Sequence, residues 1–199
     1  MTPEEIRARL TVPWHHGEFV DLRGITCTGP LDLAGCALTG VDFTGARFPE
    51  GLDARGARFD GISWLRSITI EGPALFAGVQ FMNDARFEDA RFTGSADFAQ
   101  AEFRGISRFD NVRFEDGASF AGSVCYGNFS LQRVEARGAM SFAGGEWLGG
   151  LWCQGARLPE GTDLSDTQVH GRLWLRDARR GNAALETADF GMSFGYTYF

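Results

Sequence analysis

The sequence predicts an all-β solenoid, a β-helix whose short strands coil around one core, because its apolar residues repeat every eleven positions. Two series of large apolar residues each keep this period, and together they alternate in steps of five and six residues. A second, mostly smaller residue precedes each large one by two positions, and residues two apart on a strand share a face. Each unit therefore turns one small and one large side chain inward. An antiparallel sandwich would not keep this phase along most of the 199 residues.

The predicted core is made of the large residues of both series. The chain has 18 Phe but only 3 Tyr, which indicates a dry interior, because a buried tyrosine hydroxyl needs a hydrogen-bond partner. In the middle of the chain the predicted core residues are Phe76, Phe81, Phe87, Phe92, Phe98, Phe103, Phe109, Phe114, Phe120, Phe142 and Trp147.

Stretches such as ADFAQAEFRG (96–105) and ARFEDARFTG (85–94) resemble the pentapeptide-repeat family, in which a central Leu or Phe follows a small residue by two. The resemblance implies a right-handed quadrilateral β-helix, here a variant with an eleven-residue double repeat and 22 residues per coil. The sides of the coil then alternate between five and six residues. The extra residue of each six-residue side lies at a corner, and the two such corners are diagonally opposite. Glycines are frequent there, and we expect them to provide the unusual backbone dihedrals of a bulged corner.

The open ends of a solenoid must be covered, because they carry unpaired strand edges. Residues 1–18 are predicted to be an N-terminal helical cap, with a capping box at Thr2 and Glu5 and a helix over about residues 3–10. Residues 19–190 form the β-helix, and residues 191–199 are an aromatic C-terminal cap or dimerisation segment. Its candidate dimer contacts are Phe194, Tyr196, Tyr198 and Phe199, and the alternative is that this segment folds back as an intramolecular lid.

Composition excludes several classes of function. The net charge of −7 argues against direct binding to nucleic acid or to an anionic membrane. No apolar run approaches the length of a membrane span, and the charged first residues do not resemble a signal peptide. Four cysteines without metal-ligand spacing indicate buried thiols in a reducing compartment, so we expect a cytoplasmic protein.

No enzyme activity is predicted. The three histidines, His15, His16 and His170, lie at no catalytic spacing, and the first two precede the repeat. No glycine-rich phosphate loop and no zinc-protease motif occurs. A coil packed with phenylalanine also leaves no interior cleft. We therefore expect no catalytic residue, no cofactor and no metal site.

The repeat register assigns outward residues to four faces, named here after the Phe76, Phe81, Phe87 and Phe92 columns. Arginine and tryptophan, residue types enriched at protein-binding hot spots, gather on two adjacent faces. The candidate partner surface is Trp64, Arg86, Arg108, Trp152 and Trp174 on the Phe87 face with Arg91, Arg113 and Arg157 on the Phe92 face. The alternative is that these arginines pair with a candidate acidic strip of Glu88, Asp89, Asp110, Glu115 and Asp116.

These observations favour a non-enzymatic scaffold or interaction module with a protein partner. The resemblance implies an alternative, because characterised family members mimic DNA, bind DNA gyrase and protect it from quinolones or peptide toxins, as dimers joined through their C-terminal ends. Duplex DNA carries one charge per about 1.7 Å, so a rod of about 38 Å would need about 22 negative charges. The net charge of −7 falls well short of that.

Overall fold

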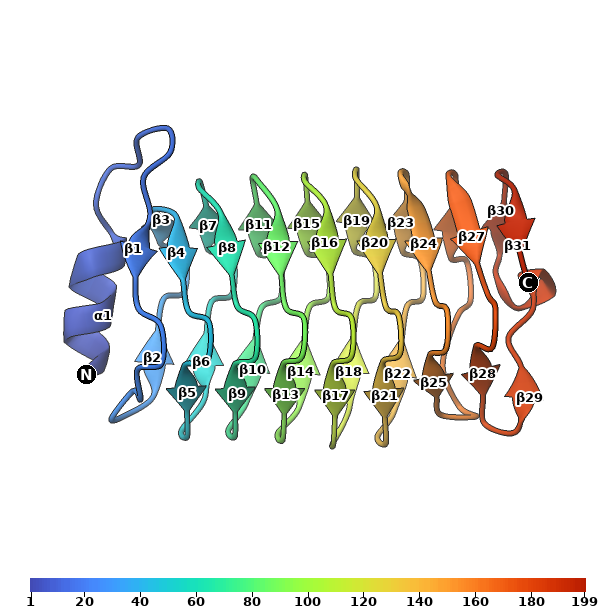
Figure 1. Cartoon of the computed structure of the whole chain (residues 1–199), viewed down its shortest axis with the longest axis horizontal. Coiled ribbons are helices and arrows are strands. Elements are labelled where there is room, and N and C mark those ends of the chain that lie inside the picture. The colour runs from blue at the N-terminus through green and yellow to red at the C-terminus, as the bar shows by residue number, and fades with distance from the viewer.

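A computed structural model, which describes residues 1–199, shows a parallel β-solenoid of about eight coils with one α-helix at its N-terminal end (Figure 1). Strands of two or three residues stack from coil to coil into four sheets, one for each side of the coil. This arrangement confirms the predicted all-β solenoid and its four-sided coil. No helix is long and apolar enough to cross a bilayer.

Two opposite sides of the coil carry the first apolar series. The Phe87 face consists of β1 (Val20–Asp21), β4 (Val41–Asp42), β8 (Ser63–Trp64), β12 (Ala85–Arg86), β16 (Ser107–Arg108), β20 (Phe129–Ser130), β24 (Gly150–Trp152), β27 (Arg172–Trp174) and β31 (Thr197–Tyr198). The Phe76 face consists of β2 (Leu31–Asp32), β6 (Leu52–Asp53), β10 (Ala74–Leu75), β14 (Ala96–Asp97), β18 (Ala118–Ser119) and β22 (Met140–Ser141).

The other two sides carry the second series. The Phe92 face consists of β5 (Arg47–Phe48), β9 (Thr69–Ile70), β13 (Arg91–Phe92), β17 (Arg113–Phe114), β21 (Glu135–Ala136), β25 (Arg157–Leu158), β28 (Arg179–Arg180) and β29 (Ala183–Ala184), the last of which is antiparallel. The Phe81 face consists of β3 (Ala37–Leu38), β7 (Arg58–Phe59), β11 (Gln80–Phe81), β15 (Glu102–Phe103), β19 (Val124–Cys125), β23 (Glu146–Trp147), β26 (Gln168–Val169) and β30 (Met192–Ser193).

We call a corner five-residue or six-residue by the number of positions between the two core residues that it joins. At each five-residue corner the chain turns through a residue with left-handed backbone conformation, two positions after the core residue of the first series. Glycine takes this place in several coils, as at Gly78 (φ 65°), since it adopts positive φ without strain. In three successive coils between the Phe87 and Phe92 faces the residue is instead Asp89, Asn111 and Arg133, with φ of 54° to 61°. These three form a ladder, because Asn111 Nδ2 donates to Asp89 Oδ1 (3.0 Å) and Arg133 Nε donates to Asn111 Oδ1 (2.7 Å).

Six-residue corners use glycine for a different reason from the one we expected. Apart from Gly181 in the β28–β29 hairpin, only Gly51 and Gly150 among these corner residues have positive φ, at 98° and 117°. At Gly127 the constraint is space, because an added Cβ would lie 2.5 Å from the carbonyl oxygen of Gly105 in the preceding coil. The prediction of unusual dihedrals is therefore wrong for most of these corners. Close approach of successive backbones excludes a side chain there.

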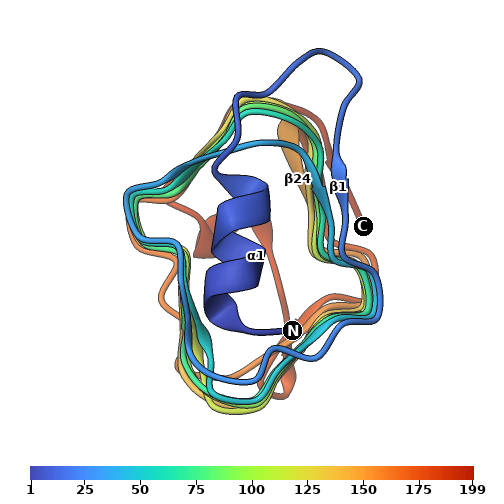
Figure 2. The same cartoon turned by 90° about the vertical axis from the view of Figure 1, so that its left-hand side faces the viewer.

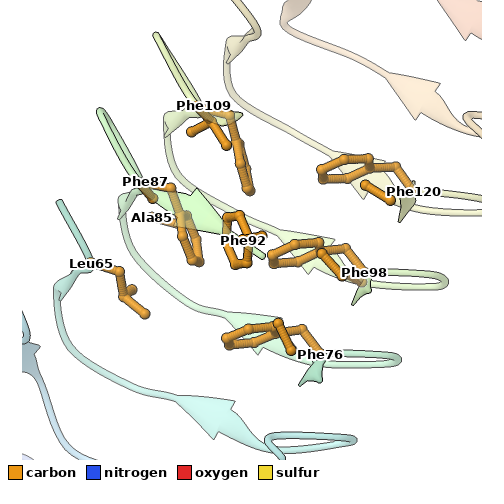
Figure 3. Packing of buried hydrophobic residues seen from close by; sticks show 14 of the residues in the cluster. Leu65, Phe76, Ala85, Phe87, Phe92, Phe98, Phe109 and Phe120 are labelled. Atoms are coloured by element: carbon orange, nitrogen blue, oxygen red, sulfur yellow. The ribbon is translucent and has the colours of Figure 1, made fainter. Parts of the chain in front are cut away.

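The core is a set of stacked phenylalanine columns (Figure 3). All eleven predicted core residues have at most 1% of their surface exposed. Phe98 stacks on Phe76 at 4.8 Å and on Phe120 at 5.0 Å, with interplanar angles of 4° and 2°. Rings from adjacent sides meet edge to face, as Phe98 and Phe109 do at 5.3 Å. Both geometries are favourable arrangements of aromatic quadrupoles.

Side-chain sizes compensate one another in the later coils. Cys125 replaces a phenylalanine between Phe103 and Trp147 on the Phe81 face. The ring of Phe129 fills that space from the neighbouring side, 5.4 Å from Phe103 and 4.4 Å from Trp147. Trp147 itself is fully buried. The larger ring thus occupies space that the smaller core residue leaves open, as close packing of the interior requires.

The two ends of the solenoid are covered differently. Helix α1 (Pro3–Leu10), with the capping box of Thr2 and Glu5, lies across the first coil and buries Ile6 and Leu10 (Figure 2). At the other end a 3₁₀ helix, η1 (Thr187–Asp189), follows the β28–β29 hairpin, and Leu185 and Phe190 cover the last core residues. Arg180, the one polar residue of the second series, pairs with Asp189 at 2.6 Å.

Thiol accessibility gives a first test of this packing. All four cysteines are free, and burial raises the pKa of Cys125 and of Cys153 to about 12. Burial also raises the pKa of Cys27, whereas Cys36 is only partly covered. Because thiolates are the reactive form, we expect Ellman's reagent at pH 8 to label Cys36 alone in the folded protein and all four cysteines in denaturant. Rapid labelling of Cys153 in the folded state would contradict this core.

Candidate protein-interaction surface

Aromatic side chains line up along the outside of the Phe87 face. Trp152 and Trp174 are register partners on β24 and β27, and their rings lie 5.9 Å apart. Tyr198 on β31 continues the column, 4.7 Å from Trp174. We call these three half-buried or exposed residues the aromatic ladder. The sequence register predicts the tryptophan stack, but it assigns Tyr198 only to the C-terminal segment.

Trp64 does not belong to this ladder. It lies several coils away, where its ring is 5.9 Å from that of Phe19 and the Arg66 guanidinium is 4.8 Å from the ring centroid. Arg86, Arg108 and Ser130 separate it from Trp152 along the face. The two groups of aromatic residues are therefore separate surface features.

Most arginines of the candidate partner surface are neutralised inside the chain. On the Phe87 face Arg86 pairs with Glu88 at 2.7 Å, and Arg108 lies 4.0 Å from Asp110. On the Phe92 face the ion pairs are Arg91–Glu115 at 3.1 Å and Arg113–Glu135 at 3.7 Å. For these four arginines the structure favours internal ion pairing over a partner-binding role.

The candidate acidic strip is divided between two corners. Glu88, Asp89 and Asp110 lie between the Phe87 and Phe92 faces, whereas Glu115 and Asp116 lie between the Phe92 and Phe76 faces. Glu115 pairs with Arg91 and, at 2.9 Å, with Arg137. Asp110 is nearly buried and accepts hydrogen bonds from the Ser130 hydroxyl and the Gln132 backbone N–H. The five residues therefore do not form one continuous acidic surface.

Exposed arginines near the C-terminal end lack the ion pairs that most arginines of the earlier coils make. Arg157, Arg176 and Arg179 have no carboxylate within 4.0 Å, and we call them the arginine patch. Arg157 and Arg179 are register partners on β25 and β28. Of the three, only Arg157 is in the predicted partner surface, although Arg179 stands in the same column.

An open cavity of about 530 Å³ adjoins the arginine patch. Arg176 and Arg179 line it together with Asp177 and Glu186, and the buried side chains of Leu175, Ala178 and Leu185 also contribute to its wall. It forms where the last corner between the Phe87 and Phe92 faces meets η1 and the side chain of Phe199. The aromatic ladder, the arginine patch and this cavity thus occupy the same end of the solenoid.

The candidate dimer contacts are largely exposed. Exposure is 62% at Phe194, 81% at Tyr196, 40% at Tyr198 and 74% at Phe199. β30 and β31 add outer strands to the Phe81 and Phe87 faces, and no further strand pairs with them. Leu185 and Phe190 act as a lid over the core, while these four aromatic residues remain outside it.

Near the N-terminus, His15 and Trp14 contact Glu18 within the connecting loop. His15 Nδ1 lies 3.1 Å from a Glu18 carboxylate oxygen, and Trp14 Nε1 donates to the Glu18 carbonyl oxygen at 3.2 Å. His170 lies far along the chain, stacked 4.9 Å from the ring of Phe194. These contacts bring no nucleophile or acid to the histidines other than Glu18.

Four sheets around a phenylalanine core define a quadrilateral β-solenoid with four outer faces. A family model described as "Pentapeptide repeats (9 copies)" matches residues 22–69, 55–101 and 76–124, which together are more than half of the chain. The chain belongs to the pentapeptide-repeat family. A search of the curated proteins finds no match.

Proposed function

We propose that this protein is a non-enzymatic interaction module that binds a protein partner through its C-terminal coils. The observation that carries the proposal is a contrast between arginines. Arg86, Arg91, Arg108 and Arg113 of the central coils are paired with carboxylates, whereas the arginine patch is unpaired and lies at the same end of the solenoid as the aromatic ladder. Tryptophan, tyrosine and arginine are the residue types that dominate binding energy at protein interfaces.

Site-specific photo-crosslinking in cells tests this function. A photoreactive amino acid at Trp152 should capture a discrete protein partner, and the same amino acid at Ser119, on the opposite Phe76 face, should not. Binding of the purified partner should then weaken about tenfold, or about 1.4 kcal/mol, in Trp174→Ala. Capture of the same proteins from both positions would contradict a specific surface.

We also propose a homodimer joined through the C-terminal ends. The exposed aromatic residues Phe194, Tyr196 and Phe199 support it, because a twofold contact would bury them on both copies at once. Light scattering at tens of micromolar is expected to give the mass of a dimer for the intact chain and of a monomer after deletion of residues 194–199. Tyr196→Ser with Phe199→Ser is the matched variant that keeps β31. A monomer mass for the intact chain would refute the dimer.

DNA mimicry toward DNA gyrase is the alternative function. Family membership supports it, but Glu88 and Glu115 are paired with arginines and Asp110 is nearly buried. We therefore expect gyrase supercoiling, with and without a quinolone, to be unchanged at high micromolar protein. Inhibition or protection that disappears on charge reversal of Glu88, Asp89 and Asp110 would favour the DNA mimic instead. Either function fits a cytoplasmic location, which we propose from the four free thiols.

A further inference from the structure

We propose that the arginine patch and the adjoining cavity bind an acidic, extended segment of a protein partner, with carboxylates on Arg157 and Arg179 and one apolar side chain in the cavity. This inference rests on the proposed function, because it specifies the chemistry of what docks on the same end of the solenoid. It is carried by three observations: a charge imbalance, the composition of the cavity and the charge of the whole chain.

Two like charges lie directly opposite each other in the Phe92 face. Arg157 on β25 and Arg179 on β28 are register partners, an arrangement that destabilises a sheet unless counter-charges are near. In two earlier coils the counter-charge comes from a corner residue 24 positions later, in the pairs Arg47–Glu71 and Arg91–Glu115. The same corner column holds Pro159 and Gly181 in the last coils, so no carboxylate reaches this pair from there.

The other charged groups near the patch do not neutralise it. Glu135, one coil before Arg157, is paired with Arg113 at 3.7 Å. Glu160, Asp177 and Glu186 approach no arginine within 4.0 Å. Arg179 donates one hydrogen bond from Nη1 to the Asn182 carbonyl oxygen (3.1 Å). Its remaining donors are available to an incoming carboxylate, which guanidinium groups bind in a bidentate geometry.

The cavity beside the patch matches an apolar side chain. Its volume of about 530 Å³ is within the usual range for ligand sites, and Leu175, Ala178 and Leu185 give it an apolar wall. Arg176 and Arg179 line the same cavity, so a residue bound there would have guanidinium groups next to its neighbours. An extended peptide alternates its side chains between two sides and can place a carboxylate and an apolar group in turn.

Charge favours a peptide over a nucleic acid as the occupant. A nucleic acid carries a phosphate at every nucleotide, and the chain as a whole has a net charge of −7. Asp177 and Glu186 also line the cavity and would repel a continuous phosphate backbone. A peptide can instead present its carboxylates to the arginines and an uncharged side chain to the cavity.

Fluorescence polarisation with the full chain tests the proposal. The probe is a short fluorescein-labelled peptide in which glutamates flank one phenylalanine. Analogues with lysine in place of glutamate, and with alanine in place of phenylalanine, serve as ligand controls. We expect the glutamate peptide to bind, the lysine peptide not to bind, and the affinity to fall steeply with salt, as expected for exposed charges. A single-stranded oligonucleotide of similar length should bind more weakly than the glutamate peptide.

Matched variants assign the binding to these arginines. Arg157→Gln with Arg179→Gln should weaken binding about tenfold or more. Arg104→Gln should leave it unchanged, since that exposed arginine pairs with Glu102 elsewhere on the coil. Melting curves are expected to be the same for all variants or higher for the double variant, in which the like-charge pair is relieved.

Several results would overturn the acidic segment. Unchanged affinity in the double variant, tighter binding of the oligonucleotide, or no peptide binding below about 1 mM would each do so. The crosslinked partner separates this failure from that of the proposed function. If a partner is captured at Trp152 but binds the double variant with unchanged affinity, the interaction module stands and the acidic segment does not.

Discussion

Replacing Phe98 by alanine is expected to lower the free energy of unfolding by about 3–5 kcal/mol. The Phe98 ring lies between Phe76 and Phe120 at 4.8 and 5.0 Å and meets the edges of Phe87 and Phe109 at 5.5 and 5.3 Å. The rings around it belong to columns fixed by strand hydrogen bonds above and below, so they can collapse only slightly into the vacated space. Urea unfolding followed by circular dichroism measures the loss.

Two further variants separate the cost of the space left in the core by Phe98→Ala from other effects of losing the ring. Phe98→Leu keeps much of the side-chain volume and is expected to cost less than the alanine variant. Phe194→Ala removes the same ring from an exposed position, so it should change the stability of the monomer by no more than about 0.5 kcal/mol. A loss of less than about 1 kcal/mol for Phe98→Ala would show that the register of the core is wrong.

Sequence alone determines the core of this protein because one short rule repeats. The eleven-residue period places Phe76 and Phe98 in the same column, and the structure stacks them at 4.8 Å. The structural reason for a glycine at a given corner is harder to predict from the sequence. Gly78 is needed for its positive φ, while Gly127 is needed because the backbone of Gly105 lies against it. That distinction depends on how closely successive coils approach, which the residue pattern does not contain.

The position of the candidate surface follows from the repeat register, whereas the pairing of its arginines depends on a second column of residues. The register puts Arg91 and Arg157 in one column of the Phe92 face, yet only Arg91 has a carboxylate partner. The partner, Glu115, stands 24 positions later at a corner, and in the last coils that corner column ends in Pro159 and Gly181. The residue types in these two columns therefore distinguish the paired arginines from the unpaired ones. The cavity has no such signal in the sequence, because it forms where the repeat has ended.

Replacing Gly149 by valine is expected to destabilise the fold by about 3 kcal/mol or more, through overpacking at a six-residue corner. An added Cβ would overlap the carbonyl group of Gly127 in the preceding coil. That backbone cannot move away freely, because Leu148 donates to the Cys125 carbonyl oxygen at 2.9 Å on one side of the corner. On the other side β24 pairs with β20. Thermal and urea unfolding of the variant measure the effect.

Gly161→Val is the matched control for this prediction. Gly161 occupies the end of another six-residue corner, but no atom lies within 4 Å of its added Cβ and its φ is not positive. Valine there should change the free energy of unfolding by no more than about 0.5 kcal/mol, as for most exposed positions. The two variants add the same side chain, so their difference isolates the contact between successive coils. Equal losses at Gly149 and Gly161 would mean that backbone conformation, not close approach, requires glycine at these corners.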